Sequence, residues 1–342
     1  MDGSSRPVTL DEWEAAARVV LPAGVYDYIA GAAGAERTLA DNERAFDRWT
    51  LWPTVLRGSG SPDTSSSLFG RPLAFPLGVA PWAFQWQVHP DGELATARAA
   101  AELGVPMCVS STVLDGPEDV ASAGGDLWWQ LYIWRDRTAS AELLRRAQAA
   151  GYRALVWTVD VPALGLRYRD ARSGFTLPVG PAGSVQEFDP DISWSDLAWI
   201  KQQVPGMPVL VKGILRPDDA RAALEHGADG LIVSNHGGRQ LDRTPASLDA
   251  LPGIVEVVDR RVPVLMDGGV RDGVDVLIAL ALGADAVLVA RPTAWGLAVD
   301  GQGGVAAVLT FLRDGFANAM ANAGCRSVGE IGRRLLEPAT PG

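Results

Sequence analysis

Short apolar runs alternate with longer amphipathic segments from residue 77 to residue 290, and this alternation constrains the fold more than any other feature of the chain. The runs are rich in Val, Ile, Leu and Trp and are bounded by turn residues, as buried strands are. They are Leu77–Ala80, Pro106–Ser110, Leu127–Ile133, Ala154–Val159, Pro208–Lys212, Gly230–Ser234, Pro263–Asp267 and Ala286–Ala290. Helical patterns lie between them at Gly92–Leu103, Ser140–Ala150, Pro217–His226 and Val274–Leu282.

Eight strand-then-helix units of this size predict an α/β fold, a closed (β/α)8 barrel (TIM barrel). The rival is an open doubly wound sheet, which normally carries a glycine-rich dinucleotide loop after its first strand. The residues after Leu77–Ala80 contain no such loop. We therefore expect the barrel.

The rest of the chain is expected to form one domain with this barrel, over residues 1–342. Residues 1–76 precede the first strand and hold two helical stretches, Leu10–Val20 and Gly24–Ala32, which we interpret as an N-terminal cap on a barrel at 77–335. The Pro- and Gly-containing tail at 336–342 is expected to be disordered. The irregular segment Leu164–Pro190 follows the fourth strand and is predicted to be a mobile active-site lid.

Composition excludes several classes of partner. A net charge of −11 argues against nucleic-acid binding and against binding to an anionic membrane surface. We find no secretory signal and no apolar stretch of about 18 residues, so we expect a cytoplasmic protein that does not span a membrane. The two cysteines, Cys108 and Cys325, and the histidines His89 and His226 have no metal-ligand spacing, so no metal site is expected.

Polar and charged side chains follow six successive strands, at the face where barrel enzymes place their sites. They include Gln130 and Tyr132, Thr158 and Asp160, Lys212, Ser234, Asp267, and Arg291. Each residue alone is a weak signal. Their recurrence at strand ends predicts one shared site, because strands with a structural role alone would mostly end in turn residues.

The sequence Ser234-Asn235-His236-Gly237-Gly238-Arg239-Gln240-Leu241-Asp242 carries the clearest chemistry. Its two glycines give the backbone the freedom to bring His236 and Arg239 onto one ligand. A titratable imidazole beside a guanidinium suits a substrate that has both an acidic proton and a carboxylate.

The last two strand ends predict a phosphate site. Loops after strands seven and eight of such barrels often bind phosphate through backbone amides and arginine, and Gly268, Gly269, Arg271 and Arg291 supply these parts. The alternative is that the glycines only make turns and the arginines form surface ion pairs. From a phosphate here, a ligand would extend toward Lys212, Thr158, Gln130 and Ser110, which suit the edge of a flat heterocycle.

These motifs together resemble the FMN-dependent 2-hydroxy-acid oxidase and dehydrogenase family, which includes enzymes that oxidise glycolate, lactate and mandelate, and hydroxymandelate oxidases. The resemblance runs from about Leu10 to Leu335. The Ser234–Gln240 stretch is the family's signature. Supporting matches are Val25–Tyr28, His89–Glu93, Gln130–Tyr132, Thr158–Asp160 and Asp267–Arg271.

The resemblance implies that His236 takes the substrate hydroxyl proton while hydride passes to flavin N5. Removal of the α-proton first would use the same base and stays open. Asp160 would orient the imidazole, and Arg239 and Arg167 would bind the substrate carboxylate, with Arg167 as an exposed surface residue the alternative. Tyr28 and Tyr132 would place phenol hydroxyls near the substrate.

The resemblance also implies FMN as cofactor. Lys212 would stabilise the negative charge that develops on the reduced ring. The residues expected around FMN are Ala80, Pro81, Trp82, Ala83, Ser110, Gln130, Thr158, Lys212, Ser234, Asp267, Gly268, Gly269, Arg271, Ala290 and Arg291.

Three residues depart from the family pattern. Trp82 stands where relatives carry a small residue or threonine, and it either narrows the cavity or fills core. Thr112 replaces an aromatic residue of several relatives, which suggests extra room for substrate. Ala290 replaces a glycine, and an alanine would cost about 1 kcal/mol there if the position required positive φ.

The expected activity is therefore FMN-dependent oxidation of an (S)-2-hydroxy acid to the 2-oxo acid, with an aromatic, mandelate-like substrate suggested by Thr112 and the nearby tryptophans. Oxygen is the expected electron acceptor; a dehydrogenase or an oxidative-decarboxylating monooxygenase is the alternative. A non-redox barrel isomerase with a phosphate site is the alternative of a different class. By resemblance alone, we expect a homotetramer or octamer.

Overall fold

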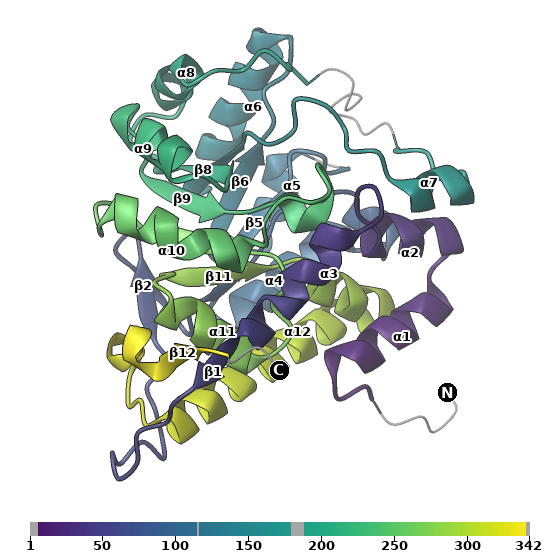
Figure 1. Cartoon of the computed structure of the whole chain (residues 1–342). Coiled ribbons are helices and arrows are strands. Elements are labelled where there is room, and N and C mark those ends of the chain that lie inside the picture. Colours follow the sequence, from purple (N-terminus) through teal and green to yellow (C-terminus); the bar gives the residue numbers. More distant parts are fainter. Residues whose placement is uncertain (1–5, 115, 179–187, 340–342) are drawn as a thin grey trace.

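The structure is a computed structural model that describes residues 6–114, 116–178 and 188–339 (Figure 1). Eight parallel strands close into a barrel in which each strand pairs with the next along the chain and β11 pairs with β4. The strands are β4 (Leu77–Val79), β5 (Met107–Val109), β6 (Leu127–Leu131), β7 (Ala154–Thr158), β8 (Val209–Ile214), β9 (Gly230–Val233), β10 (Val264–Asp267) and β11 (Ala286–Val289). The predicted (β/α)8 barrel is confirmed.

Strand side chains alternate between the barrel interior and the helical layer. In β9, for example, Leu231 and Val233 belong to the large core beneath the helices, whereas Ile232 belongs to a separate interior cluster with Leu210 and Leu265. Both faces of each strand are covered, so the strands are mainly apolar and show no polar alternation. Their polar residues are Gln130, Thr158, Lys212 and Asp267, at or near the carboxyl ends.

Helices surround the barrel (Figure 1). The longer ones are α4 (Gly92–Glu102), α6 (Arg137–Ala149), α8 (Ser195–Gln203), α9 (Pro217–Glu225), α10 (Ser247–Val258), α11 (Gly273–Ala281) and α12 (Arg291–Ala323). The four that the sequence predicts are observed as α4, α6, α9 and α11. Shorter helices are α5 (Pro117–Ala121), α7 (Tyr168–Ser173), η1 (Phe46–Arg48), η2 (Gln85–Gln87), η4 (His236–Gly238), η5 (Val328–Glu330) and η6 (Arg333–Leu335).

The N-terminal segment contains more structure than the two predicted helices, α1 (Leu10–Val20) and α2 (Ala23–Ala30). A third helix, α3 (Arg37–Arg44), buries Thr38 and Asn42, so it has no apolar stripe by which periodicity could reveal it. An antiparallel hairpin, β2 (Ser66–Leu68) with β3 (Arg71–Leu73), places Leu68 and Leu73 in the interior cluster of the barrel.

The tail is partly ordered, which corrects the expectation of disorder at 336–342. Strand β12 (Leu336–Pro338) pairs antiparallel with β1 (Trp49–Leu51). This ladder joins segments almost 300 residues apart, so the sequence near the tail carries no sign of it. Residues 340–342 lie outside the described residues.

Helix α12 contains an 18-residue window that is apolar and long enough for a membrane span, contrary to our expectation that the chain has no such stretch. Half of that window is buried inside the protein. The helical backbone is also broken at Asp300 and Gly301, and the helix packs against α1, α4 and α11. These are features of a core helix.

The predicted lid contains α7 and is attached to the cap. Gly34 N–H donates to Leu166 O, and Arg169 pairs with Glu36 at 2.6 Å. Residues 179–187 of the lid lie outside the described residues. Its predicted mobility stays a prediction.

Candidate active site

A cavity lies at the carboxyl ends of the barrel strands, and its volume is about 1190 Å³ when the part open to solvent is included. Eighteen of the predicted site residues line it: Tyr28, Ala80, Pro81, Trp82, Ala83, Ser110, Gln130, Tyr132, Arg167, Lys212, His236, Arg239, Asp267, Gly268, Gly269, Arg271, Ala290 and Arg291. The other three, Thr158, Asp160 and Ser234, contact residues in this group. The structure thus brings the predicted set together.

His236 lies between a carboxylate and a phenol. Its Nδ1 is 3.0 Å from Asp160 Oδ1, and its Nε2 is 3.5 Å from the hydroxyl of Tyr132. If Nδ1 carries the proton and donates a hydrogen bond to Asp160, Nε2 is left as a hydrogen-bond acceptor at the cavity. This is the tautomer that a general base requires.

The electrostatic surroundings keep the imidazole neutral and the carboxylate charged. Burial, together with the positive charge of Lys212, lowers the pKa of His236 below its ordinary value, although Asp160 opposes this. Burial alone would raise the pKa of Asp160, but its interaction and hydrogen bond with His236 and the charge of Lys212 outweigh burial and lower the pKa. A neutral base with a charged partner can accept a proton and be stabilised afterwards.

The turn that presents His236 requires its glycines. Gly237 and Gly238 have φ of 62° and 76°, and His236 itself has φ of 59°. A Cβ on Gly238 would lie 2.8 Å from the backbone nitrogen of Leu39. The strained conformation of a non-glycine residue at this point is a feature of functional sites.

Two arginines face the same end of the cavity. Arg239 donates through Nη1 to Tyr28 O (2.6 Å) and Gly31 O (2.8 Å), and its guanidinium lies 4.7 Å from the centre of the Tyr28 ring. Burial and the neighbouring Arg167 lower the pKa of Arg239 to about 10, so it remains charged at neutral pH. The side chain of Arg167 is 10% exposed and also lies over Tyr28, which rules out the surface alternative.

Lys212 ends the predicted fifth strand and is 3% exposed. Its Nζ donates to Ser234 Oγ (2.8 Å) and lies 3.2 Å from Asp267 Oδ2. Burial alone would lower the pKa of Lys212, but the charges of Asp267 and Asp160 outweigh it and raise the pKa. The cavity therefore contains a fixed positive charge.

Polar side chains from three strand ends form one hydrogen-bonded row. Gln130 Oε1 accepts from the Ser111 N–H (3.1 Å) and the Ser110 hydroxyl (3.3 Å), and Gln130 Nε2 donates to Thr158 Oγ1 (3.1 Å). Thr112 continues the row through a 2.7 Å contact with Ser110. The row offers donors and acceptors to a planar ligand.

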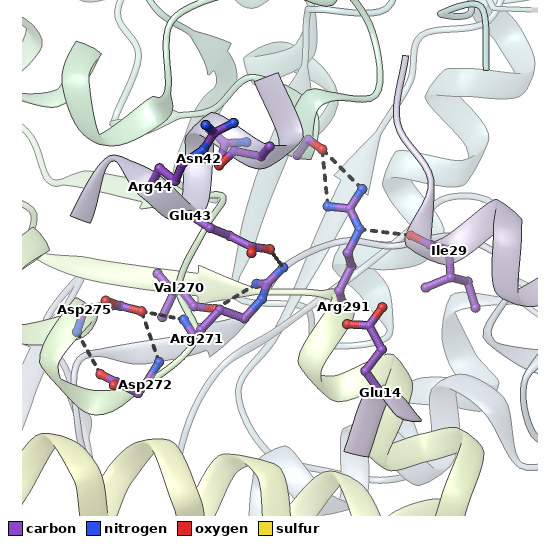
Figure 2. Close-up of polar contacts among 12 residues, drawn as sticks. Glu14, Ile29, Asn42, Glu43, Arg44, Val270, Arg271, Asp272, Asp275 and Arg291 are labelled. Atoms are coloured by element: carbon purple, nitrogen blue, oxygen red, sulfur yellow. Dashed lines mark hydrogen bonds and ion pairs between the residues drawn. The ribbon is translucent and has the colours of Figure 1, made fainter. Parts of the chain in front are cut away.

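The predicted phosphate residues also line the cavity, and Figure 2 shows the two arginines among them, Arg271 and Arg291. Gly268 and Gly269 follow β10 with φ of 96° and 88°, and a Cβ on Gly269 would lie 2.0 Å from Asn42 O. Arg271 pairs with Glu43 at 2.6 Å, and Arg291 donates to Ile29 O (3.0 Å), Gly31 O (2.8 Å) and Gly237 O (3.2 Å). Burial and the charges of Arg239 and Arg271 lower the pKa of Arg291 to about 9.

The departures from the family pattern have separate outcomes. Trp82 and Thr112 line the cavity, and the Trp82 indole N–H is buried without a partner among the described residues. Ala290 has φ of −120°, so the position does not require positive φ and the cost expected for that case does not arise.

Sequence reasoning missed the apolar wall of the cavity, which includes Phe84, Val161, Leu164, Leu177 and Phe188. Phe188 stacks on Tyr132 with the ring centres 4.4 Å apart. It lies in the irregular segment after the fourth strand, where no periodic pattern distinguishes a lining residue from any other.

The residues present fit FMN. Two arginines and a glycine turn suit a phosphate, the polar row suits a heterocycle, and Asp267 Oδ1 is buried without a partner among the described residues. A proton acceptor for a hydroxyl and a clamp for a carboxylate lie in the same cavity. This combination defines a flavin-dependent barrel oxidoreductase.

A family model described as FMN-dependent dehydrogenase matches residues 17–338, and the chain belongs to this family. It is 44% identical to human 2-hydroxyacid oxidase 1, over 97% of this chain and 96% of the relative. It is 43% identical to 4-hydroxymandelate oxidase of Amycolatopsis orientalis, over 96% and 97%. A crystal structure of mandelate oxidase with benzoyl-formic acid superposes with a TM-score of 0.92 at 45% identity, over 98% and 99%.

These comparisons confirm the expected family, the FMN cofactor and the class of enzyme. The chain is an FMN-dependent oxidoreductase whose close homologues are 2-hydroxy-acid oxidases. The non-redox isomerase alternative is set aside.

Proposed function

We propose that the chain oxidises (S)-2-hydroxy acids with an aromatic, mandelate-like side chain to 2-oxo acids and that oxygen is the final electron acceptor. The observation that carries the proposal is the single cavity shared by the His236–Asp160 pair, the Arg239–Arg167 pair and an apolar wall. The oxidase names of its relatives support oxygen as acceptor.

Each protein group has a defined task. Arg239 and Arg167 bind the substrate carboxylate, because guanidinium groups form short, charge-assisted hydrogen bonds with carboxylates. His236 Nε2 receives the hydroxyl proton, and Asp160 stabilises the imidazolium that results. Lys212 keeps a positive charge where the cofactor becomes negative. Bound FMN supplies the two-electron acceptor.

The aromatic preference rests on the cavity wall. Tyr28, Trp82, Phe84, Tyr132 and Phe188 present ring surface to the cavity, and such surface favours a flat apolar group. Thr112 also lines the cavity, and its small side chain takes up less of it than an aromatic residue would.

The purified protein is expected to be yellow. Under anaerobic conditions, (S)-mandelate should bleach the flavin faster than (S)-lactate or glycolate does. Reoxidation by air should yield hydrogen peroxide and the 2-oxo acid. Release of carbon dioxide would instead indicate the monooxygenase, and slow reoxidation by air the dehydrogenase. Colourless protein that cannot be reconstituted with FMN would contradict the whole proposal.

Replacing Thr112 with phenylalanine should lower kcat/KM for mandelate about 10-fold or more, because overpacking a site costs about 1–3 kcal/mol. The value for glycolate, which has no side chain to displace, should change little. Equal losses for the two substrates would contradict the assignment of this space to the substrate side chain.

The acid limb of the kcat/KM profile is expected below pH 6.5. The ordinary histidine pKa is about 6.5, and burial lowers the pKa of His236 below that value. The base is active only when neutral, so activity falls as pH drops through this lowered pKa. Asp160→Asn removes a charge that raises the pKa of His236. Its acid limb should therefore move to still lower pH, with a lower plateau.

The oligomeric state and the location are proposals that rest on resemblance and composition. We propose a cytoplasmic homotetramer or octamer of the 36.2 kDa chain. Light scattering of the purified protein measures the mass that decides the first of these.

A further inference from the structure

A carboxylate from the N-terminal cap pairs with an arginine of the predicted phosphate site. Glu43 lies in the last turn of α3, and its Oε1 is 2.6 Å from Nη2 of Arg271 (Figure 2). Arg271 lines the cavity. The pair is partly open to solvent, with side chains 46% exposed for Glu43 and 27% for Arg271.

Glu43 contributes little to the packing of α3 on the barrel. The residues that this helix buries are Thr38 and Asn42, and the exchange of hydrogen bonds between Asn42 and Asn235 attaches the helix to the barrel. A partly exposed ion pair such as Glu43–Arg271 contributes little to folding. Its main effect is therefore on the charge of the cavity.

Hydrogen bonds fix Arg271 at both its backbone N–H and its guanidinium, and Glu43 binds the guanidinium. The Arg271 N–H donates to Asp275 Oδ2, which also accepts from the Asp272 N–H at the start of α11. The guanidinium donates to Val270 O and to Glu43 Oε1. Glu43 is the carboxylate that the structure places on this guanidinium.

The same cap acts on the second arginine. The negative charges of Glu43 and of Glu14, from α1, favour the charged form of Arg291 against its burial. Glu14 also accepts a 2.9 Å hydrogen bond from the Tyr26 hydroxyl. The cap thus sets two carboxylates against the two arginines that the phosphate is expected to need.

We propose that Glu43 competes with the FMN phosphate for Arg271 and so weakens binding of the cofactor. A phosphate carries up to two negative charges and needs the N–H donors that Glu43 occupies. It must displace a carboxylate that then repels it. The proposal rests on the placement of the phosphate at Arg271, and it concerns a residue outside the family signature.

The test is the dissociation constant of FMN and of riboflavin, which lacks the phosphate, measured by fluorescence with the full-length protein freed of its flavin. Glu43→Gln should tighten FMN binding about three- to tenfold at low salt and leave riboflavin unchanged. The gain should shrink at high salt because the pair is partly exposed. An unchanged or weaker FMN affinity would overturn the proposal.

Three further variants separate the causes. Asp47→Asn removes one negative charge from an exposed position after α3. It should not alter the ratio of the FMN affinity to the riboflavin affinity. Arg271→Gln should lower that ratio, and in its background Glu43→Gln should have no effect, because the competitor acts through Arg271. If Arg271→Gln leaves the ratio unchanged, the phosphate placement is wrong. If only the Glu43→Gln gain is missing, the placement stands and the competition is wrong.

Discussion

Replacement of His236 by alanine is expected to slow the reduction of bound FMN by substrate about 10²- to 10⁴-fold, the range for loss of a general base. The reason is geometric: Nε2 faces Tyr132 at the cavity while Nδ1 is held by Asp160 at 3.0 Å. FMN should stay bound, because most of the predicted phosphate and ring contacts lie on other strand ends. Anaerobic stopped-flow bleaching of the flavin measures the rate.

The backbone at His236 calls for a second variant. Its φ of 59° is costly for alanine but is tolerated by asparagine, so His236→Asn separates loss of the base from damage to the turn. Both variants should retain the flavin spectrum and lose reduction. Bleaching at the wild-type rate in either would refute His236 as the base.

Replacement of Lys212 by methionine is expected to lower the free energy of unfolding by about 3–5 kcal/mol, the range for breaking a buried ion pair. The ammonium is 3.2 Å from Asp267 Oδ2, and both side chains are nearly inaccessible, so the variant leaves a buried carboxylate without its counter-charge. FMN retention should fall as well, because the positive charge facing the cofactor is lost. Denaturant unfolding and dialysis against buffer measure the two effects.

The double variant Lys212→Met with Asp267→Asn removes both charges and should recover much of the stability. It should not recover reduction of FMN by substrate, since the positive charge is still absent. Recovery of both would mean that Lys212 acts only in folding. A Lys212→Met protein as stable as wild type would contradict the ion-pair argument.

The barrel was predictable because each strand and helix has its own local pattern. The predicted strands begin and end within two residues of those observed. The largest differences are at the end of β6, which stops at Leu131 rather than Ile133, and at the end of β8, which continues past Lys212 to Ile214. There a bulge shifts the register, and a Cβ on Gly213 would lie 2.7 Å from the Cβ of Asp160. Such an irregularity follows from packing between strands, which one strand's sequence does not contain.

What escaped prediction depends on pairing between distant segments. The β1–β12 ladder, the hairpin that fills the barrel interior and the polar helix α3 have no periodic signal of their own. The same holds in the site. His236, Arg239 and Lys212 stand at recognisable strand ends. Phe188 instead reaches the cavity from an irregular segment, and Glu43 pairs with the cavity residue Arg271 from the cap.

The carbonyl of Gly31, just after α2, accepts hydrogen bonds from both Arg239 and Arg291, each at 2.8 Å. Neighbouring carbonyls of the same helix end, Tyr28 O and Ile29 O, take one further bond from each. A barrel separated from this helix would leave the Arg239 guanidinium without these two acceptors and Arg291 with Gly237 O alone. The segment up to Gly31 therefore cannot be exchanged or removed independently of the barrel. In any recombination or truncation of such proteins, cap and barrel must be kept together.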